Sequence, residues 1–375
     1  MAAKSAPSRP GTLEDLHLVD LDLHPNESSG LMPARSARLL ESFGWHTAFW
    51  TVLDDGLVDH CIALVGRDSD AASPTAGWEI RRLRAHVTSQ TAETEDCEAI
   101  ARQGEWIYAF GSHYGSKSGP LQAKRHFVAR FHEEDVTAPD DEGDPHVDLQ
   151  VVETRFALHA MVNDALRTAD VRLNALGPKA RKRIVTRTRR QAIADGEDWF
   201  WRVRWDDLPV NIEGAAFRPD GAVLLGLRYP VTVDGHPLVV EVDGIEGLFE
   251  AGGEAPVVRG VWEVRGVGAP DELTGVRDLH IQGNVLHLLV GNIDATGVGS
   301  VLLEDHPEGA VARSAHWRVK LPAGRHGGAL TATPVRSFDD LERVEGMAAD
   351  EHGDFFYVSD EDDRVKTRFT STSFG

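Results

Sequence analysis

NIEGAAFRPDGAVLLGLR, residues 211–228, contains two short apolar segments joined by the turn Pro219-Asp220-Gly221. Turn residues of this kind between two apolar runs predict a β-hairpin. The first segment opens with a polar residue, Asn211, and a carboxylate, Glu213. This hairpin is the template with which the rest of the chain can be compared.

Three further stretches repeat the pattern: DCEAIARQGEWIYAFGSH (96–113), VRDLHIQGNVLHLLVGN (276–292) and RVEGMAADEHGDFFYVSD (343–360). The carboxylates Glu213, Asp278 and Glu345 follow one another at intervals of about 65 residues, and Glu98 precedes Glu213 by nearly twice that distance. Further strand-like runs follow each hairpin. A repeat of about 60 residues with three or four strands predicts an all-β fold, the β-propeller, whose blades surround a central channel.

The length of 375 residues corresponds to about six blades, and five or seven are also compatible with it. A plain β-sandwich would not need a carboxylate at the same place in every unit. We therefore expect one propeller domain over residues 1–375, with a flexible N-terminus at 1–12. Residues 1–95 contain strand-like runs but no clear copy of the repeat.

Residues 160–200 interrupt the repeat and are predicted to form a helical insertion that breaks at Gly177-Pro178. Between Lys179 and Arg190 this insertion carries seven positive charges and no negative one. It could bind an acidic protein partner or cover an anionic substrate. Alternatively, the protein's own acidic surface neutralises it. Trp199, Trp201 and Trp205 follow directly and are expected to pack the insertion onto the propeller.

The overall charge narrows the class of partner. The chain has 39 Lys and Arg against 60 Asp and Glu, a net charge of −21. Such a surface is a poor match for nucleic acid or an anionic membrane. No apolar run approaches the length of a membrane span, and the first residues have no apolar core for a secretory signal. Two cysteines exclude a disulfide scaffold. These features predict a soluble, cytoplasmic protein.

The repeated units resemble a bacterial family known as domain of unknown function 3616, and more distantly the phytase-associated esterase-like propellers. The resemblance covers residues 95–135 and 205–370. It rests on the strand starts at Glu98, Glu213 and Glu345, and on the segments Gly111-Ser112-His113, Leu225–Arg228, Arg277-Asp278-Leu279 and Tyr357–Asp362. The chain departs from the family pattern at Ala99 and Leu279, where a glycine would follow the carboxylate. The resemblance implies a propeller fold and no particular activity.

In a propeller the first strand of each blade lies innermost, so a residue repeated at its start forms a ring near one mouth of the channel. The predicted ring contains Glu98, Glu213, Asp278 and Glu345, and Arg277 would point to the opposite face. The mutual repulsion of these carboxylates can be relieved by protonation, by an arginine or by a hard cation. A central Ca²⁺ or Mg²⁺ is one hypothesis, with Asn211, Asn292 and backbone carbonyls as further ligands. The alternative is that each carboxylate accepts backbone N–H bonds from the neighbouring blade.

Two further residues follow the second strand of their units, His113 and Arg228. His113 could act as a general acid or base, and Arg228 could hold an anionic group of a ligand. We therefore expect a small polar or anionic ligand at the channel mouth. Metal-assisted hydrolysis or lyase chemistry on a lactone, ester or phosphoester would use Glu213 and His113, with Arg228, Asn211, Asn292 and Arg277 binding the substrate. The alternative is a non-catalytic scaffold that binds a protein through its loops and basic insertion.

Overall fold

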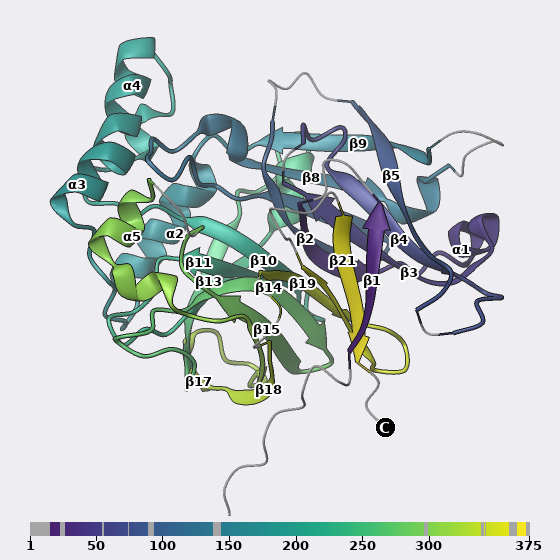
Figure 1. Cartoon of the computed structure of the whole chain (residues 1–375). Helices are drawn as coiled ribbons and strands as arrows, with labels where there is room; N and C mark the ends of the chain where they lie inside the picture. Colours follow the sequence, from purple (N-terminus) through teal and green to yellow (C-terminus); the bar gives the residue numbers. More distant parts are fainter. Residues whose placement is uncertain are drawn as a thin grey trace, which may run out of the picture.

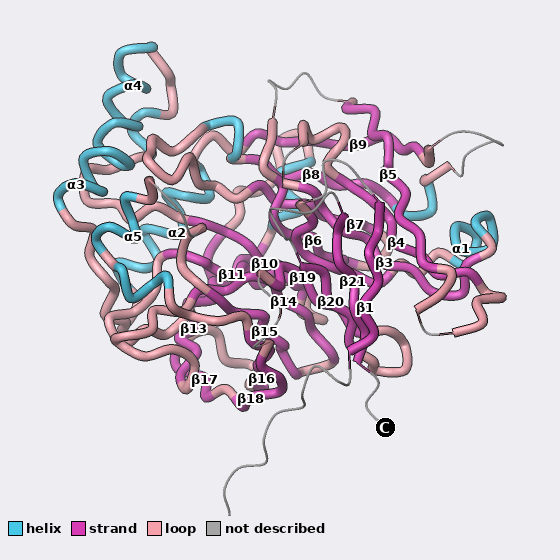
Figure 2. Tube along the Cα trace, in the orientation of Figure 1, coloured by secondary structure: helices cyan, strands magenta, loops and turns pink. Residues whose placement is uncertain are grey.

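The computed structural model describes residues 16–22, 27–54, 56–73, 75–88, 94–137, 144–295, 299–338, 341, 343–359 and 366–372. Residues 1–12 and the acidic stretch 360–362 lie outside this range. The described strands form five blades around a common centre, so the predicted β-propeller is confirmed (Figures 1 and 2). Helices α2 to α5 gather on one side of the molecule, and α1 lies on the opposite side (Figure 2).

The first two blades are built in chain order. Blade 1 contains β2 (Ser28–Pro33), β3 (Trp45–Leu53), β4 (Ile62–Asp68) and β5 (Trp78–Val87), with α1 (Ala37–Phe43) after its first strand. Blade 2 contains β6 (Cys97–Gln103), β7 (Trp106–Gly111), β8 (Phe127–His132) and β9 (His146–Glu153). Their outermost strands, β5 and β9, pair in parallel and join the two blades into one sheet.

The next two blades follow the insertion. Blade 3 contains β10 (Asn211–Phe217), β11 (Val223–Tyr229), β12 (Leu238–Asp243) and β13 (Val257–Arg265), and β17 (Gly328–Thr331) adds to its edge in parallel. Blade 4 contains β14 (Gly275–Gln282), β15 (Val285–Gly291), β16 (Ala315–Lys320) and β18 (Thr333–Ser337). The short helix α5 (Val301–Asp305) lies between β15 and β16.

The fifth blade closes the ring with both ends of the chain. It contains β19 (Val344–Ala349), β20 (Phe355–Ser359), β21 (Lys366–Thr372) and, as its outermost strand, β1 (Leu16–Asp22). Strand β1 pairs antiparallel with β21 over its whole length (Figure 1). The pairing of the first strand with the last one holds the two ends of the described chain together and closes the ring of blades.

Five blades lie at the lower end of the predicted range of five to seven, and the central value of six is one too many. The long interval between Glu98 and Glu213 suggested two blade repeats, but it contains one blade and the helical insertion. The insertion consists of α2 (Ala157–Thr168), α3 (Pro178–Arg181), a π-helical turn at Lys182–Thr186, α4 (Arg187–Asp195) and a 3-10 turn at Phe200–Arg202. Helix α3 begins at Pro178 after the predicted break. Among the described residues, no helix is long and apolar enough to cross a membrane.

The hydrophobic core lies between neighbouring blades. Leu225 and Val240 of blade 3, for example, pack with Tyr108 and Phe110 of blade 2 and with Val162 of α2. The other end of the insertion packs separately: Ile184, Val185 and Trp199 form a cluster with Tyr114 and Leu121 of the β7–β8 loop. The insertion is therefore fixed against the loop that borders the channel mouth.

A buried histidine pair lies where blades 4 and 5 meet. The Nδ1 atom of His287 is 2.8 Å from Nε2 of His316, and Nδ1 of His316 is 2.9 Å from the Tyr357 hydroxyl. Burial lowers the pKa of His287 to about 4 and that of the nearby His280 to about 3. These imidazoles are therefore neutral in the folded protein at neutral pH.

We expect these histidines to make the fold less stable in mild acid. Below about pH 6.5 these histidines bind protons in the unfolded chain but not in the folded chain. The free energy of unfolding therefore falls as the pH drops from about 6.5 to 4. Above pH 6.5 the histidines contribute no pH dependence. The check is urea unfolding at pH 7 and pH 5, in which His287→Gln should lose less stability between the two pH values than the wild type. Replacing the exposed His86 should leave the difference unchanged, and an unchanged difference in His287→Gln would contradict the assignment.

Candidate active site at the channel mouth

The innermost strand of every blade carries a β-bulge at the same place. In β2, β6, β10, β14 and β19 the pairing with the second strand skips one residue, and these residues are Gly30, Glu98, Glu213, Arg277 and Glu345. A bulge re-aims a side chain out of the ordinary alternation of the strand. The ring at the channel mouth therefore consists of three glutamates, one arginine and one glycine.

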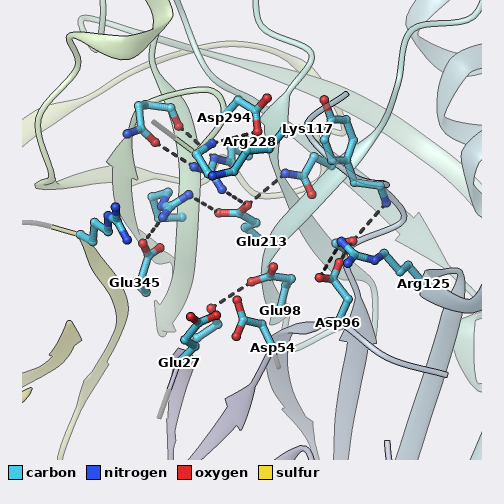
Figure 3. Close-up of a pocket in the computed structure, with 18 of the residues that line it drawn as sticks. Glu27, Asp54, Asp96, Glu98, Lys117, Arg125, Glu213, Arg228, Asp294 and Glu345 are labelled. Carbon is cyan, nitrogen blue, oxygen red and sulfur yellow. Dashed lines mark hydrogen bonds and ion pairs between the residues drawn. The ribbon is translucent and has the colours of Figure 1, made fainter. Parts of the chain in front are cut away.

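These strand starts and the loops after the second strands enclose a cavity of about 390 Å³ (Figure 3). Its acidic lining residues are Glu27, Asp54, Asp96, Glu98, Glu213, Asp294 and Glu345, and its basic ones are Lys117, Arg125, Arg228, Arg277 and Arg343. Ser29, Ser112, Asn211 and Asn292 add neutral polar groups. The surplus of carboxyl groups makes the cavity more suitable for neutral or positively charged ligands than for anions.

Arginines neutralise the part of the cavity formed by blades 3 to 5. Arg277 pairs with Glu213 at 2.8 Å and also with Glu345. Arg228 donates to the other oxygen of Glu213 at 2.6 Å and to the Asn292 side chain at 2.9 Å. Both guanidinium groups are almost completely buried. An arginine placed between the carboxylates was one of the predicted ways to relieve their repulsion. In this half of the ring Arg277 and Arg228 have that role.

In the other half, which blades 1 and 2 provide, the environment favours protonation of the carboxyl groups. Among the described residues, no arginine or lysine lies within ion-pair distance of Glu98 or Asp54, and Glu98 accepts a hydrogen bond from Ser29 at 2.9 Å. Burial raises the pKa of Glu98 well above its ordinary value, and the negative charges of Glu213 and Asp96 raise it further. Burial and the neighbouring Glu98 and Glu27 likewise raise the pKa of Asp54. Burial in this half of the cavity therefore favours the protonated form of Glu98 and Asp54.

Asp96 lies at the edge between these two halves. Burial raises its pKa to about 6, although Arg125 at 2.8 Å and the Ser112 hydroxyl oppose the shift. Its backbone is left-handed with φ of 72°, and Arg343, the equivalent residue before Glu345, has φ of 51°. Non-glycine residues rarely adopt this conformation and are concentrated at functional sites. The two strained residues both line the cavity.

Four buried polar atoms of cavity-lining residues have no hydrogen-bond partner among the described residues: Oδ1 of Asp54, Nε of Arg125, Oδ1 of Asn211 and the hydroxyl of Tyr114. The two on neutral side chains belong to Asn211 and Tyr114, residues that are 4% and 5% exposed. The amide nitrogen of Asn211 donates to Glu213 at 3.0 Å, which fixes the orientation of its free oxygen. Buried polar atoms are normally satisfied, so these two atoms are candidates for contact with a ligand.

The position of Asp278 differs from the prediction. The bulge places Arg277, and not Asp278, in the channel, because the extra residue shifts the alternation of inward and outward side chains. Asp278 instead accepts backbone N–H bonds from Leu31 at 3.2 Å, Leu279 at 2.7 Å and Met347 at 2.7 Å. It therefore connects blade 4 to blades 1 and 5. This agrees with the alternative prediction, in which the carboxylate accepts backbone N–H bonds from a neighbouring blade.

His113 also lies away from the cavity. Its backbone has φ of 60°, and its ring is completely buried, with Nδ1 2.8 Å from the Gly111 carbonyl and Nε2 3.2 Å from the Thr154 hydroxyl. Burial lowers its pKa to about 4. A neutral imidazole with both nitrogens occupied cannot reach a ligand at the channel mouth, so the predicted catalytic role of His113 is not supported by its position.

The four carboxylates predicted to bind a metal are not assembled around one point. Glu213 and Glu345 share Arg277, and Asp278 faces backbone amides. Among the described residues, no group of three or more His, Cys, Asp and Glu side chains is arranged to hold a metal ion. The predicted ligand-binding residues Arg228, Asn211, Asn292 and Arg277 do line one cavity together with Glu98, Glu213 and Glu345.

Several cavity residues were absent from the sequence prediction, among them Glu27, Asp54, Tyr114 and Asp294. For Asp96, the sequence contained one indication that it lies at the cavity. It precedes Glu98 by two residues, as Asn211 precedes Glu213, and residues two apart on a strand share a face. The loop residues have no such periodic signal, because only the closure of the ring brings them to the mouth.

No family model and no curated protein matches the chain. Among solved structures, the chain is similar to an α-L-arabinofuranosidase from Clostridium thermocellum, with 7% identity, coverage of 91% of this chain and 84% of the other, and a TM-score of 0.39. It is also similar to an exo-1,5-α-L-arabinanase from a bovine ruminal metagenomic library, with 8% identity, 93% and 94% coverage and a TM-score of 0.36. YCF48 bound to a D1 peptide matches with 10% identity, 94% and 68% coverage and a TM-score of 0.28.

At these identities the likeness concerns the fold alone. The strand order and the cavity define the class directly: the chain is a five-bladed β-propeller with a buried, carboxyl-rich pocket at one mouth of its channel.

Proposed function

We propose that this propeller binds a small, neutral, hydroxyl-rich ligand, such as a sugar, a polyol or a sugar lactone, in the pocket at the channel mouth. The observation that carries the proposal is the buried Asn211 Oδ1, an acceptor without a hydrogen-bond partner among the described residues, on a side chain that lines a pocket whose buried arginines are paired with carboxylates. Its neighbour Tyr114 adds an unpartnered hydroxyl. A volume of about 390 Å³ is near the lower end of the range typical of small-molecule sites.

The ion pairs favour a neutral ligand over the anionic one considered from the sequence. Arg228 and Arg277 both bind Glu213, so an anionic group would have to displace a carboxylate to reach either guanidinium. Serine hydroxyls, amides and uncharged carboxyl groups can instead donate to and accept from ligand hydroxyls. A polar neutral ligand thus fits the pocket with the existing ion pairs intact.

The same groups would support hydrolysis or elimination on such a ligand. Burial raises the pKa values of Glu98 and Asp54, which favours their protonated form, and in that form either could donate a proton to a leaving oxygen. Glu213, fixed by two arginines, could stabilise developing positive charge or orient a water molecule. A lactone or ester would use these roles without a histidine.

A divalent cation is the second candidate for this pocket, and it would bind near Glu98 and Asp54, which form no ion pair with an arginine or lysine among the described residues. Glu27, Asp54 and Glu98 line this part of the pocket beside Ser28 and Ser29, and a cation would have to draw their carboxyl groups together, since they are not arranged around one point. Calcium prefers six to eight oxygen ligands of this kind. The Ca²⁺ or Mg²⁺ hypothesis is therefore proposed for these residues in place of the full ring of four carboxylates.

The ligand proposal is tested by thermal unfolding in the presence of a panel of sugars, polyols and sugar lactones, with CaCl₂, MgCl₂ and EDTA as separate conditions. A ligand at 100 times its Kd adds about 2.7 kcal/mol to the stability of the folded state, which shifts the midpoint visibly. We expect at least one neutral compound to raise the midpoint. In Asn211→Ala the shift should be smaller, and the apparent affinity calculated from it should fall at least tenfold.

The matched control is Asn284→Ala, which changes an exposed asparagine in the hairpin between β14 and β15. It should leave the ligand-induced shift intact. If no neutral compound raises the midpoint and only Ca²⁺ or Mg²⁺ does, the cation proposal replaces the first one. If Asn211→Ala retains the full shift, the ligand does not use this pocket.

A further inference from the structure

Exposed aromatic side chains gather at the end of the helical insertion. Ile193, Phe200, Trp201 and Trp205 all belong to the segment 193–205, and Trp201 and Trp205 are 60% and 48% exposed. They form half of the large hydrophobic side chains that are exposed among the described residues. Of the three tryptophans expected to pack the insertion onto the propeller, only Trp199 does so, stacking on Phe156 at 4.4 Å.

Arginines hold the exposed rings in place. The guanidinium carbon of Arg189 lies 4.8 Å from the Trp205 ring and 5.7 Å from that of Phe200, and Arg189 also donates to the Phe200 carbonyl at 3.2 Å. Arg202 lies 5.4 Å from the Trp201 ring and donates to the carbonyls of Thr154 and Arg155 at 3.1 and 2.8 Å. Rings that are fixed before binding lose little entropy when a partner covers them.

The same insertion also carries a row of exposed cations. Lys182, Arg183, Arg187 and Arg190 are exposed, and none forms an ion pair or hydrogen bond with the described residues through its side chain. Arg183, Arg187 and Arg190 are spaced by four and three residues, so they lie on one face of the helix. Among the described residues, one ion pair neutralises a charge of the basic stretch, that of Lys179 with Glu304.

We infer that this basic–aromatic patch, formed by Lys182, Arg183, Arg187, Arg190, Trp201 and Trp205, binds an acidic peptide segment of a protein partner. Helix α4, which carries Arg187 and Arg190, projects away from the blades (Figure 1). Aspartates and glutamates of the partner pair with the cations of α4 and the π-helical turn. Aromatic or aliphatic side chains of the partner cover Trp201 and Trp205. Tryptophan and arginine are the residues that most often dominate protein-binding energies.

The charges around the patch favour a short peptide over an anionic membrane or a nucleic acid. Exposed Asp195, Asp198 and Asp206 lie in the same segment as the two tryptophans. Without the seven cations of the insertion, the rest of the chain has a net charge of about −28. An extended polyanion would approach these carboxylates as well as the cations, whereas a peptide can contact the patch alone.

The test begins with a displayed library of 12-residue peptides selected on the full chain. We expect the selected peptides to contain several Asp or Glu residues together with Trp, Phe or Leu. A labelled peptide from this selection should lose at least tenfold in affinity with Arg183→Glu/Arg187→Glu/Arg190→Glu, and likewise with Trp201→Ala/Trp205→Ala. These side chains are exposed, so both variants should fold, which circular dichroism verifies. The control Arg81→Glu, another exposed arginine, should bind as the wild type does.

Two results would overturn the inference. Selection on the triple charge-reversal variant could return the same acidic peptides, or the selected peptide could bind both variants as tightly as the wild type. Vesicles of phosphatidylserine and phosphatidylcholine and a single-stranded oligonucleotide are assayed in parallel. If either binds tightly and in a patch-dependent way while no acidic peptide does, the partner is a membrane or a nucleic acid. None of these outcomes depends on the channel pocket, so the ligand proposal and this inference fail separately.

Discussion

Replacing Arg277 by alanine should lower the free energy of unfolding by about 3–5 kcal/mol at pH 7. The side chain is buried and bridges Glu213 and Glu345 in the channel. Among the described residues, its removal leaves Glu345 without an ion-pair partner and leaves Glu213 with Arg228 alone. A buried charge that has lost its partner retains its desolvation cost without the compensating attraction. Urea unfolding of the variant and the wild type measures the difference.

The loss should shrink in acid. Burial raises the pKa of Glu345, so in the variant this carboxyl takes up a proton as the pH falls and the uncompensated charge disappears. Adding Glu345→Gln to Arg277→Ala should likewise recover part of the stability at pH 7. The control is Arg81→Ala, which breaks an exposed pair with Glu79 and should cost about 0–1 kcal/mol. A cost below about 1 kcal/mol for Arg277→Ala would show that the ring does not need its arginine.

Replacing Asp278 by alanine should cost about 2–5 kcal/mol and leave ligand binding at the mouth unchanged. The variant deprives the N–H groups of Leu31, Leu279 and Met347 of their acceptor within the core, and each buried donor left unsatisfied costs about 1–3 kcal/mol. Because these groups belong to three blades, the ring loses a common anchor. Urea unfolding gives the cost, and the thermal shift with the best neutral ligand gives the effect on binding.

Asp278→Asn serves as the graded comparison, because its carbonyl oxygen can keep part of the hydrogen bonding. It should lie between the wild type and the alanine variant in stability. Loss of ligand or metal binding in Asp278→Asn, with stability unchanged, would restore Asp278 to the site and contradict its role as an anchor.

The repeat in the sequence was sufficient for the fold class but not for the blade number. Hairpin turns such as Pro219-Asp220-Gly221 and the regular carboxylates are local patterns, and local patterns predict strands and their repetition. Blade 1 was not recognised because Gly30 occupies the place of the carboxylate. The interval after blade 2 was misread because a helical insertion and a blade can have similar lengths.

The candidate site was predicted in part for a related reason. Glu98, Glu213 and Glu345 were found by their repetition, and Arg228, Asn211 and Asn292 by their positions at strand ends. The presence of Arg277 in the channel, at the place expected for Asp278, could not be predicted, since a bulge of one residue reverses which side chains face the channel. Asp54, Tyr114 and Asp294 come from loops without periodicity.

The sequence by itself determined that the chain forms repeated β-hairpins with polar strand starts, since strand and turn preferences act over a few residues. It also determined the concentration of positive charge between Lys179 and Arg190. Only the tertiary structure decided which carboxylates meet arginines, which have raised pKa values and which bind backbone amides. Those outcomes depend on burial and on distances between blades, and both arise only when the fifth blade closes with β1 and β21.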